Sequence, residues 1–295
     1  GVSRGRREMT PPRRSCAVLA VALALGASAC APGAAGSGSG SRAGEGVRPR
    51  QGVSLRAEDR VVIPSMTVVL GVAISARYVF IATPNALGVF DRQFAEWLPP
   101  LTRIDGWPNV AIAAMMADPA DPAGVWFGAD NFVYHYRVGF DEVMRALVPG
   151  RVTPGAFFVE TADPTSGVVV GGGPMGFVRV SPTGFVQPYS PPPAAARVPV
   201  GSRARIEPQT IASVYAQYRN LQDFQRLLTR DDAMRTWPVL SAAASPTNAE
   251  VWLGTGGGGV FKVDPTFAQG AQVPFGLIAE GAGAVARAAD GVWFG

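Results

Sequence analysis

The one histidine of the chain, His135, lies in the segment Phe-Val-Tyr-His-Tyr-Arg-Val at 132–138. A Ser-His-Asp hydrolase would need this imidazole as its base, with a carboxylate to orient it and a nucleophile beside it. A histidine-based zinc site would need further His or Cys ligands. Strand alternation places Val133, His135 and Arg137 on one face and the three aromatic residues on the other. We therefore interpret His135 as a structural strand residue and predict no catalytic residue and no metal site.

The carboxylates are dispersed along the sequence, and three of them lie in turn sequences. Asp118 and Asp121 occur in Asp-Pro-Ala-Asp-Pro, and Asp163 occurs in Ala-Asp-Pro-Thr-Ser-Gly. Asp beside Pro is typical of turns. A calcium loop would need Asp or Asn at alternate positions of a single loop, a pattern that this sequence lacks.

Four glycines at 256–259 follow an apolar segment, so a phosphate-binding loop has to be considered. Such a loop needs a helix N-terminus, whose backbone N–H groups hold the anion. Here no Lys-Ser/Thr pair follows, and the next segment, Val-Phe-Lys-Val-Asp at 260–264, has the pattern of a strand. We predict a hairpin turn at 256–259 and no cofactor.

Residues 9–29 have the features of a bacterial signal peptide. Arg13 and Arg14 precede an apolar stretch at 16–25, and small residues follow at 26–29. The apolar stretch is too short to span the ~30 Å hydrocarbon layer of a bilayer. We therefore expect a chain that starts at Met9 and is exported by the general secretory route.

The residues Ala27-Ser28-Ala29-Cys30 resemble the lipobox of bacterial lipoproteins, although alanine replaces the more common leucine at its first position. The resemblance implies cleavage before Cys30, a diacylglyceryl group on the Cys30 thiol, and a membrane anchor at the cell envelope. The anchored protein would face the periplasm or lie on the outer membrane or cell surface. Residues 30–60, which are rich in Gly and Ser, would form a flexible linker. The alternative is an ordinary secretory signal, with Cys30 as a free thiol.

The composition favours an all-β domain with many turns. The chain is 47% hydrophobic and 16% charged, with 36 glycines and 26 prolines. Five of its 26 basic residues and one of its 22 acidic residues precede Cys30, so the remainder has 21 of each. Because nucleic-acid binding needs a basic face on the mature protein, we expect no nucleic-acid partner.

A five-residue apolar string recurs along the chain. It occurs as YVFIA at 78–82, GVWFG at 124–128, GVVVG at 167–171, EVWLG at 250–254 and GVWFG at 291–295. The ends of successive strings are 46, 43, 83 and 41 residues apart, so one interval is about twice the others. β-Branched and aromatic residues favour strands, and turn sequences precede most of the strings. Four antiparallel strands in ~40–45 residues is the repeating unit of a β-propeller.

We therefore predict an all-β fold, an incomplete β-propeller at 61–295 with about four to five blades of four antiparallel strands. The blades are expected at about 68–106, 110–149, 156–189 and 239–276. A further blade is expected to begin at 282 and to be cut by the end of the chain.

The tryptophans of the strings, Trp126, Trp252 and Trp293, are expected to pack between blades. The segment LSAAASPTNAEVWLGTGGGGVFKVDP at 240–265 resembles bacterial propeller repeats of the two-component-regulator type. That resemblance implies the fold and carries no catalytic residues.

Residues 190–238 depart from the repeat and predict a helical insertion. Apolar residues recur at spacings of three and four between Ile211 and Leu228, so we expect one helix at about 207–230, with Pro208 in its first turn. Such an excursion suits a lid or a partner-docking element. The alternative is a helix that covers an exposed blade end.

Three functions fit these features. The first is a lipid-anchored binding or scaffold module that recognises a protein or a glycan at the cell envelope. The second is the ligand-sensing part of a signalling system, and the third is a propeller enzyme such as a lyase or a quinoprotein-like dehydrogenase. We favour the first, because the dispersed carboxylates and the one histidine do not form a catalytic group. The fold by itself does not decide among the three.

We predict that the substitution Cys30→Ser releases the protein from membranes, because the serine hydroxyl does not accept the diacylglyceryl group. Membrane fractionation and incorporation of radiolabelled palmitate measure the effect. A Cys30→Ser protein that still carries label and still fractionates with membranes would contradict the prediction.

Overall fold

The computed structural model describes residues 64–140, 142–171, 173, 176–190, 205–275, 285–288 and 291–294. The expected signal peptide, Cys30 and the linker lie outside the described residues, as does the side chain of Trp293. All described residues belong to one compact unit at 55–295. Among them, no helix is both long enough and apolar enough to cross a bilayer.

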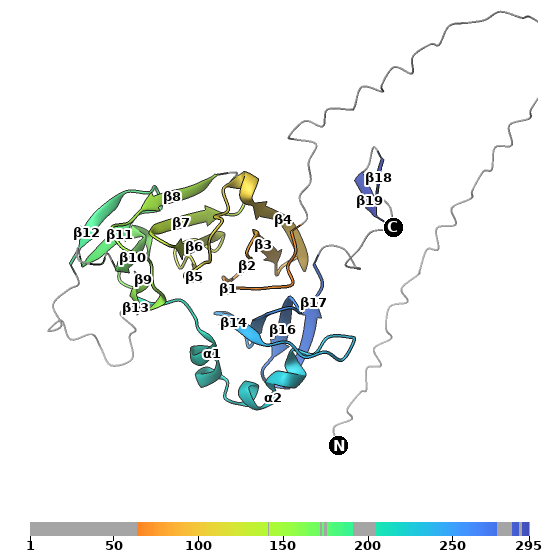
Figure 1. Cartoon of the computed structure of the whole chain (residues 1–295). Helices are drawn as coiled ribbons and strands as arrows, with labels where there is room; N and C mark the ends of the chain where they lie inside the picture. Colours follow the sequence, from red (N-terminus) through yellow and green to blue (C-terminus); the bar gives the residue numbers. More distant parts are fainter. Residues whose placement is uncertain are drawn as a thin grey trace, which may run out of the picture. The chain divides into compact units, whose positions relative to one another are not determined.

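The described residues form four antiparallel sheets, each built from four consecutive strands (Figure 1). Sheet 1 contains β1 (Gly71–Ile74), β2 (Tyr78–Ala82), β3 (Ala86–Asp91) and β4 (Glu96–Thr102). Sheet 2 contains β5 (Ala114–Ala117), β6 (Gly124–Ala129), β7 (Phe132–Arg137) and β8 (Val143–Leu147). Sheet 3 contains β9 (Phe157–Glu160), β10 (Val168–Gly171), β11 (Phe177–Val180) and β12 (Val186–Tyr189). Sheet 4 contains β14 (Val239–Ala244), β15 (Val251–Thr255), β16 (Val260–Asp264) and β17 (Gln269–Val273).

Smaller elements complete the fold. A short strand, β13 (Arg205–Ile206), adds to sheet 3 beside β9, and β18 (Val285–Ala288) pairs with β19 (Gly291–Phe294). Three short 3-10 helices lie at Arg103–Asp105, Pro154–Ala156 and Pro164–Ser166. The prediction of a mostly β fold is confirmed, and the recurring strings form the second strand of each four-stranded sheet.

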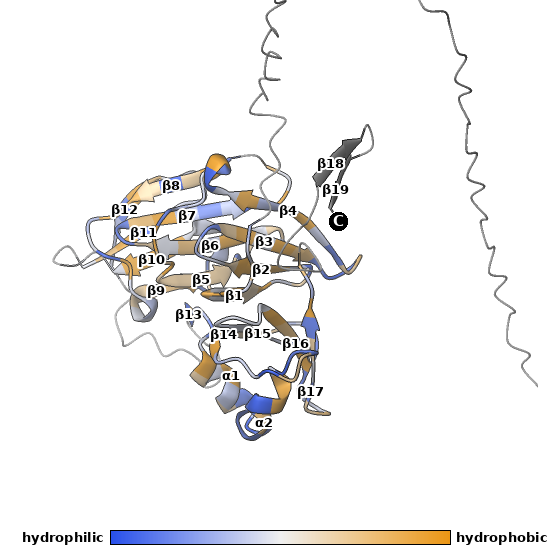
Figure 2. Cartoon of the chain, turned by 45° about the vertical axis from the view of Figure 1, so that its right-hand side comes forward, coloured by the Kyte–Doolittle hydropathy of each residue, from blue (hydrophilic) through white to orange (hydrophobic). Residues whose placement is uncertain are grey.

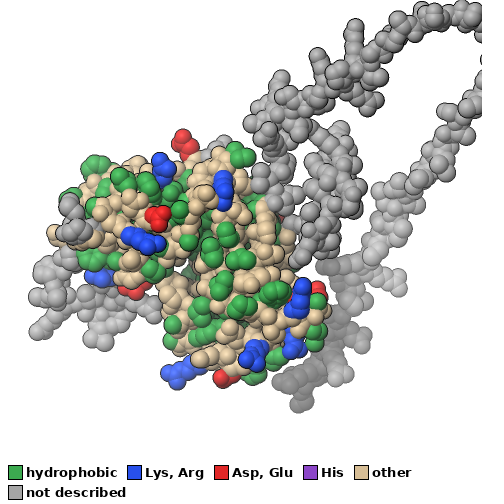
Figure 3. Space-filling view, in the orientation of Figure 1, with side chains coloured by type: hydrophobic (Ala, Val, Ile, Leu, Met, Phe, Trp, Pro, Cys, Tyr) green, Lys and Arg blue, Asp and Glu red, His purple; other side chains and the backbone are tan. Residues whose placement is uncertain are grey.

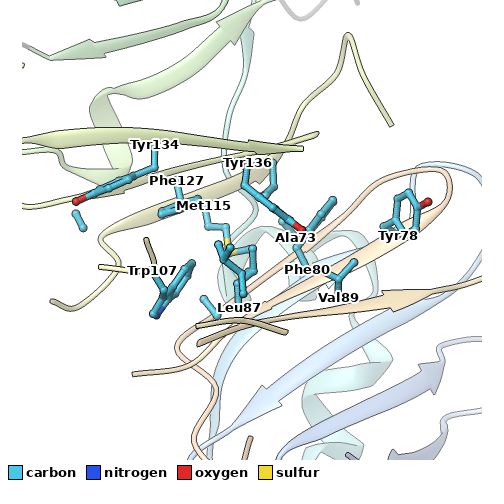
Figure 4. Packing of buried hydrophobic residues seen from close by; sticks show 14 residues of the cluster. Ala73, Tyr78, Phe80, Leu87, Val89, Trp107, Met115, Phe127, Tyr134 and Tyr136 are labelled. Atoms are coloured by element: carbon cyan, nitrogen blue, oxygen red, sulfur yellow. The ribbon is translucent and has the colours of Figure 1, made fainter. Parts of the chain in front are cut away.

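Sheet 1 is buried on both faces. Phe80, Leu87 and Val89 pack toward sheet 2, where they meet Phe127, Tyr134 and Tyr136 (Figure 4). The opposite face carries Val79, Ile81 and Phe90, which pack with Trp252 and Val260 of sheet 4. A strand covered on both faces has a continuous apolar sequence, and β2 is buried at every position.

Trp126 and Trp252 pack between neighbouring sheets, as expected. Trp126 has no exposed surface and joins the core between sheets 2 and 3, together with Val133 and Val168. Trp252 is equally buried in the core between sheets 1 and 4. Sheet 2 therefore lies between sheets 1 and 3, and sheet 1 lies between sheets 2 and 4. Sheet 4, which is separated from sheet 1 by sheets 2 and 3 in the chain, packs against it.

The helical insertion consists of two helices, α1 (Ile211–Gln217) and α2 (Asn220–Leu228), so the expectation of a single helix was wrong. Backbone angles leave the helical region at Tyr218, and the Asn220 side chain anchors the start of α2 to the carbonyl oxygen of Pro265 at 2.5 Å. Pro208 also lies before the helix and not in its first turn. Thr210 caps α1 by accepting a hydrogen bond from the backbone N–H of Ser213.

The two helices cover the face of sheet 4 that is turned away from sheet 1 (Figure 2). Val214 of α1 and Leu221 and Leu228 of α2 are buried against this face, which contributes Leu253 and Phe261. The insertion therefore closes an apolar sheet face, which agrees with the alternative stated for it from the sequence.

Residues that precede sheet 1 are bonded to sheet 4. The backbone N–H of Val69 donates to the carbonyl oxygen of Thr255 at 2.9 Å, and the carbonyl oxygen of Thr67 accepts from Gly257 and Gly259, also at 2.9 Å. At the same end of sheet 4, the indole N–H of Trp97 in β4 donates to the carbonyl oxygen of Pro274 at 2.7 Å. The segments that precede β1 and follow β17 thus both connect sheet 1 to sheet 4.

Arg92 forms the main polar contact between sheets 1 and 4. Its guanidinium donates to Ser245 and Asn248 at 2.8 Å and to the carboxylate of Glu250 at 3.4 Å. Burial alone would raise the pKa of Glu250, but the hydrogen bond from Trp252 and the positive charges of Arg92 and Lys262 hold it below its ordinary value. The carboxylate of Glu250 is therefore ionised at neutral pH and attracts Arg92 across the interface.

We predict that Arg92→Ala lowers the free energy of unfolding by about 1–3 kcal/mol, because it leaves buried polar groups of both sheets without their donor. Chemical denaturation measures the change. Arg151→Ala is the control, since Arg151 is 81% exposed and lies 3.8 Å from Asp130; its effect should be below about 1 kcal/mol. Equal effects of the two substitutions would contradict the assignment of this interface to Arg92.

Candidate functional site

A cavity of about 520 Å³ lies where the first strands of sheets 1, 2 and 4 meet. Strand β1 contacts both β5 and β14 there, and residues 206–209 close a further side. We call it the central cavity. Its volume falls in the range of small-molecule sites, roughly 300–1,000 Å³.

Small side chains on the three strands leave this space open. Ala73 and Ala76 belong to β1 and its turn, Ala117 ends β5, and Ala243 lies in β14. The rest of the lining is also mostly apolar and includes Met115, Met116 and Ile206. Its polar members are Ser75, Asp118, Glu207, Gln209 and Thr247. Among the described residues, the lining contains no Lys, Arg or His.

Residues 205–209 run from sheet 3 to sheet 4 and form one boundary of the cavity. Arg205 and Ile206 pair with β9 of sheet 3. The amide of Gln209 then pairs with the inner edge of β14: it donates to the carbonyl oxygen of Ala244 at 3.0 Å and accepts from the Ala244 N–H at 2.5 Å. A side chain thus takes the place of a neighbouring strand.

Gln209 also separates the central cavity from a second one. The second cavity, of about 350 Å³, is lined by Leu70, Ile112, Ala242 and the start of α1, and it shares Val72, Met115 and Gln209 with the first. Gln209 therefore lies at the boundary between the two spaces. No sequence pattern singles it out, because it lies between the end of β13 and the start of α1.

The two carboxylates of the central cavity differ in their surroundings. Asp118 is 6% exposed; one of its oxygens accepts from the backbone N–H of Ala120 at 2.9 Å, and the other lies 3.0 Å from Nε2 of His135. Glu207 is exposed and takes part in no ion pair or side-chain hydrogen bond with another described residue. Asp118 is a structural carboxylate with partners, whereas Glu207 is free to bind a ligand.

His135 has the contacts of a structural residue. Its ring stacks on Trp126 with centroids 4.1 Å apart, and its face of β7 is the one predicted by strand alternation. Asp118 as its partner was not foreseen, since the sequence assigned Asp118 to a turn. Asp118 does form that turn, and Asp121 forms the next by accepting from Ala123. Within the described part of the chain, no group of three His, Cys, Asp or Glu residues could hold a metal ion.

A second groove borders the other side of Asp118. It has a volume of about 600 Å³ and is lined by Asp121, His135, Arg137 and Phe140 of sheet 2 together with Thr165 and Thr183 of sheet 3. Arg137 is engaged there by an ion pair with Asp121 at 2.6 Å. This outer groove is more open and more charged than the central cavity.

The glycines at 256–259 form the predicted hairpin turn between β15 and β16. Their small size has a further reason, because the indole of Trp237 lies on the turn. A Cβ atom at Gly258 would be 2.2 Å from Cδ1 of Trp237, and one at Gly257 would be 2.3 Å from Cζ3. The turn therefore packs against a side chain of the same protein.

No protein-family model matches the sequence, and no curated protein matches it. Solved structures similar to the chain include the extracellular domain of BT4673 from B. thetaiotaomicron, which is described once as a one component system and once as a hybrid two component system. Each of these two structures is 18% identical in sequence to this chain. Their TM-scores are 0.30 and 0.29, and the matches cover 70% and 76% of this chain. Another is the hydrazine synthase of Kuenenia stuttgartiensis, with 10% identity and a TM-score of 0.31 over 80% of this chain.

The chain spans only 22% and 24% of the two BT4673 chains and 57% of the hydrazine synthase chain. At these identities and TM-scores, the likenesses assign neither a family nor an activity to this protein.

We predict that Gln209→Ala lowers the free energy of unfolding by about 1 kcal/mol, because two hydrogen bonds to the edge of β14 are lost and water replaces them only in part. Gln222→Ala is the matched control, since Gln222 is an exposed residue of α2. Urea denaturation of both variants measures the difference. A Gln209→Ala protein as stable as the Gln222→Ala protein would show that the pairing with Ala244 contributes nothing.

Proposed function

We propose that this protein is an exported binding module, built as a β-propeller and tethered to the cell envelope by a lipid on Cys30, which takes a ligand into its central cavity. The observation that carries the proposal is the cavity itself. It is partly enclosed, largely apolar and lined by few polar groups, as small-molecule sites generally are.

The arrangement of the sheets supports a propeller. The first strands of sheets 1, 2 and 4 lie side by side at the centre, and sheet 4 packs against sheet 1 (Figure 1). Helices α1 and α2 occupy the place of a blade on the free face of sheet 4. In a propeller the first strands of the blades surround a central channel, which is where the cavity lies.

Export and anchoring rest on the sequence before residue 31, where the signal peptide and the lipobox-like residues lie. Charged side chains of both signs are scattered over the face of the described residues seen in Figure 3. A protein or glycan ligand was expected from the sequence. A cavity between sheets supports a smaller molecule instead.

The ligand-sensing alternative uses the same cavity. Residues 205–209 contact sheet 3 through β13 and sheet 4 through Gln209, so a ligand beside them touches a segment shared by two sheets. That arrangement would allow occupancy to affect the packing of both. We propose no catalytic role, because the His135–Asp118 pair is held by Trp126 and by a turn.

The proposal predicts that Ala76→Trp strongly weakens binding in the central cavity, because Ala76 lines the cavity and is exposed, so an indole there would fill the space. The neutral fluorophore N-phenyl-1-naphthylamine is the probe, and its fluorescence increase on binding is the measurement. Ala233→Trp, at an exposed position outside the cavity, is the control. We expect saturable binding to the unsubstituted protein and to Ala233→Trp, and at least about a tenfold loss in Ala76→Trp. Equal binding to all three would place the probe elsewhere and contradict the proposal.

A further inference from the structure

We infer that the ligand of the central cavity is an apolar molecule with a positively charged amine, and that Glu207 binds the amine. The inference rests on the proposed function, because it concerns the same cavity. It starts from the charges at the cavity surface, where Asp118 and Glu207 are the ionisable residues and both are acidic.

Glu207 is placed to act as the charged contact. Ile206 on one side is fixed by pairing with Val159 of sheet 3, and Gln209 on the other is fixed by two hydrogen bonds to Ala244. The backbone at Glu207 is therefore held at the cavity, while its carboxylate has no protein partner among the described residues. A carboxylate in this position binds most strongly to a ligand whose positively charged group donates hydrogen bonds to it.

Asp118 adds negative charge but no open ligand position. Both of its oxygens are engaged, one by Ala120 and one by His135. Asp118 would therefore stabilise a bound cation through its electrostatic potential and not by direct contact.

Arg92 does not neutralise the cavity. Arg92 donates to the carbonyl oxygens of Ser75 and Ala76 at 2.8 and 3.1 Å, so it lies behind the turn that lines the cavity. Its other nitrogen is taken by Ser245, Asn248 and Glu250. Because Glu250 already faces this guanidinium, Arg92 does not offset the negative charge of Glu207 and Asp118 at the cavity.

The remaining lining selects the body of the ligand. Val72, Ile74, Met115, Met116 and Ile206 present apolar surface, and methionine side chains adapt to ligands of different shape. An apolar body that fills this space leaves its charged end at Glu207, at the side formed by residues 206–209. An anionic ligand of the same shape would meet two carboxylates and no cation in the lining.

Three dansyl probes that differ only at the end of a five-carbon chain test the inference. Dansylcadaverine ends in an ammonium group, N-pentyl dansylamide in a methyl group, and the third probe in a carboxylate. The full chain with Cys30→Ser is used, so that no detergent competes for the apolar cavity. Fluorescence titration gives the Kd of each probe.

We expect the ammonium probe to bind about fivefold more tightly than the neutral one, which corresponds to ~1 kcal/mol for a partly exposed ion pair, and the carboxylate probe to bind most weakly. Glu207→Gln should remove most of the ammonium preference while leaving the Kd of the neutral probe unchanged. Glu96→Gln, at an exposed position on β4, is the control and should keep the preference.

Three results would overturn the inference. If all three probes bind the unsubstituted cavity equally well, the cavity does not select positive charge, although the proposed binding function stands. If Glu207→Gln keeps the ammonium preference, another group is responsible for it. If none of the three probes binds, the inference and the proposed function fail together.

Discussion

Sheet 1 is apolar on both faces, and the arrangement of the other elements depends on this. Val79 and Phe80 are adjacent in the sequence and face opposite ways, yet neither has exposed surface. Covering only one face would leave the other in water, at a cost of ~25 cal/mol for each Å² of apolar surface. Sheet 2 follows directly in the chain and covers one face. Sheet 4, separated from sheet 1 by more than a hundred residues, must return to cover the other.

A second constraint concerns the inner edges of the sheets. A first strand has one edge that no strand of its own sheet satisfies, and unpaired backbone groups at a buried edge are unfavourable. In sheet 3, β13 satisfies part of the inner edge of β9, and in sheet 4 the Gln209 amide satisfies Ala244. The short segment at 205–209 therefore satisfies backbone groups at the inner edges of both sheets. The same segment lines the central cavity, and this places Glu207 at the cavity surface.

The strands and their grouping could be predicted from the sequence, because the recurring strings and turns are local signals. GVWFG at 124–128 and EVWLG at 250–254 both form second strands, and Trp126 and Trp252 pack between sheets as their burial requires. The spatial order of the sheets could not be predicted from local patterns, because the packing of Trp252 against sheet 1 joins residues that are distant in sequence. Gln209 and the His135–Asp118 pair gave no periodic signal. The break at Tyr218 was missed because apolar spacing continues across it.

The return of sheet 4 to sheet 1 has a consequence for how the chain is made. The face that carries Val79, Ile81 and Phe90 stays uncovered until Trp252 and Val260 have been synthesised. At a synthesis rate of ~5–20 residues per second, roughly 10–30 s pass between the two events. During that time a newly made β-sheet presents a bare apolar face, the kind of surface that associates with other unfinished chains. A chaperone that shields this face, either at the ribosome or after export, would therefore be most important before residue 260 emerges.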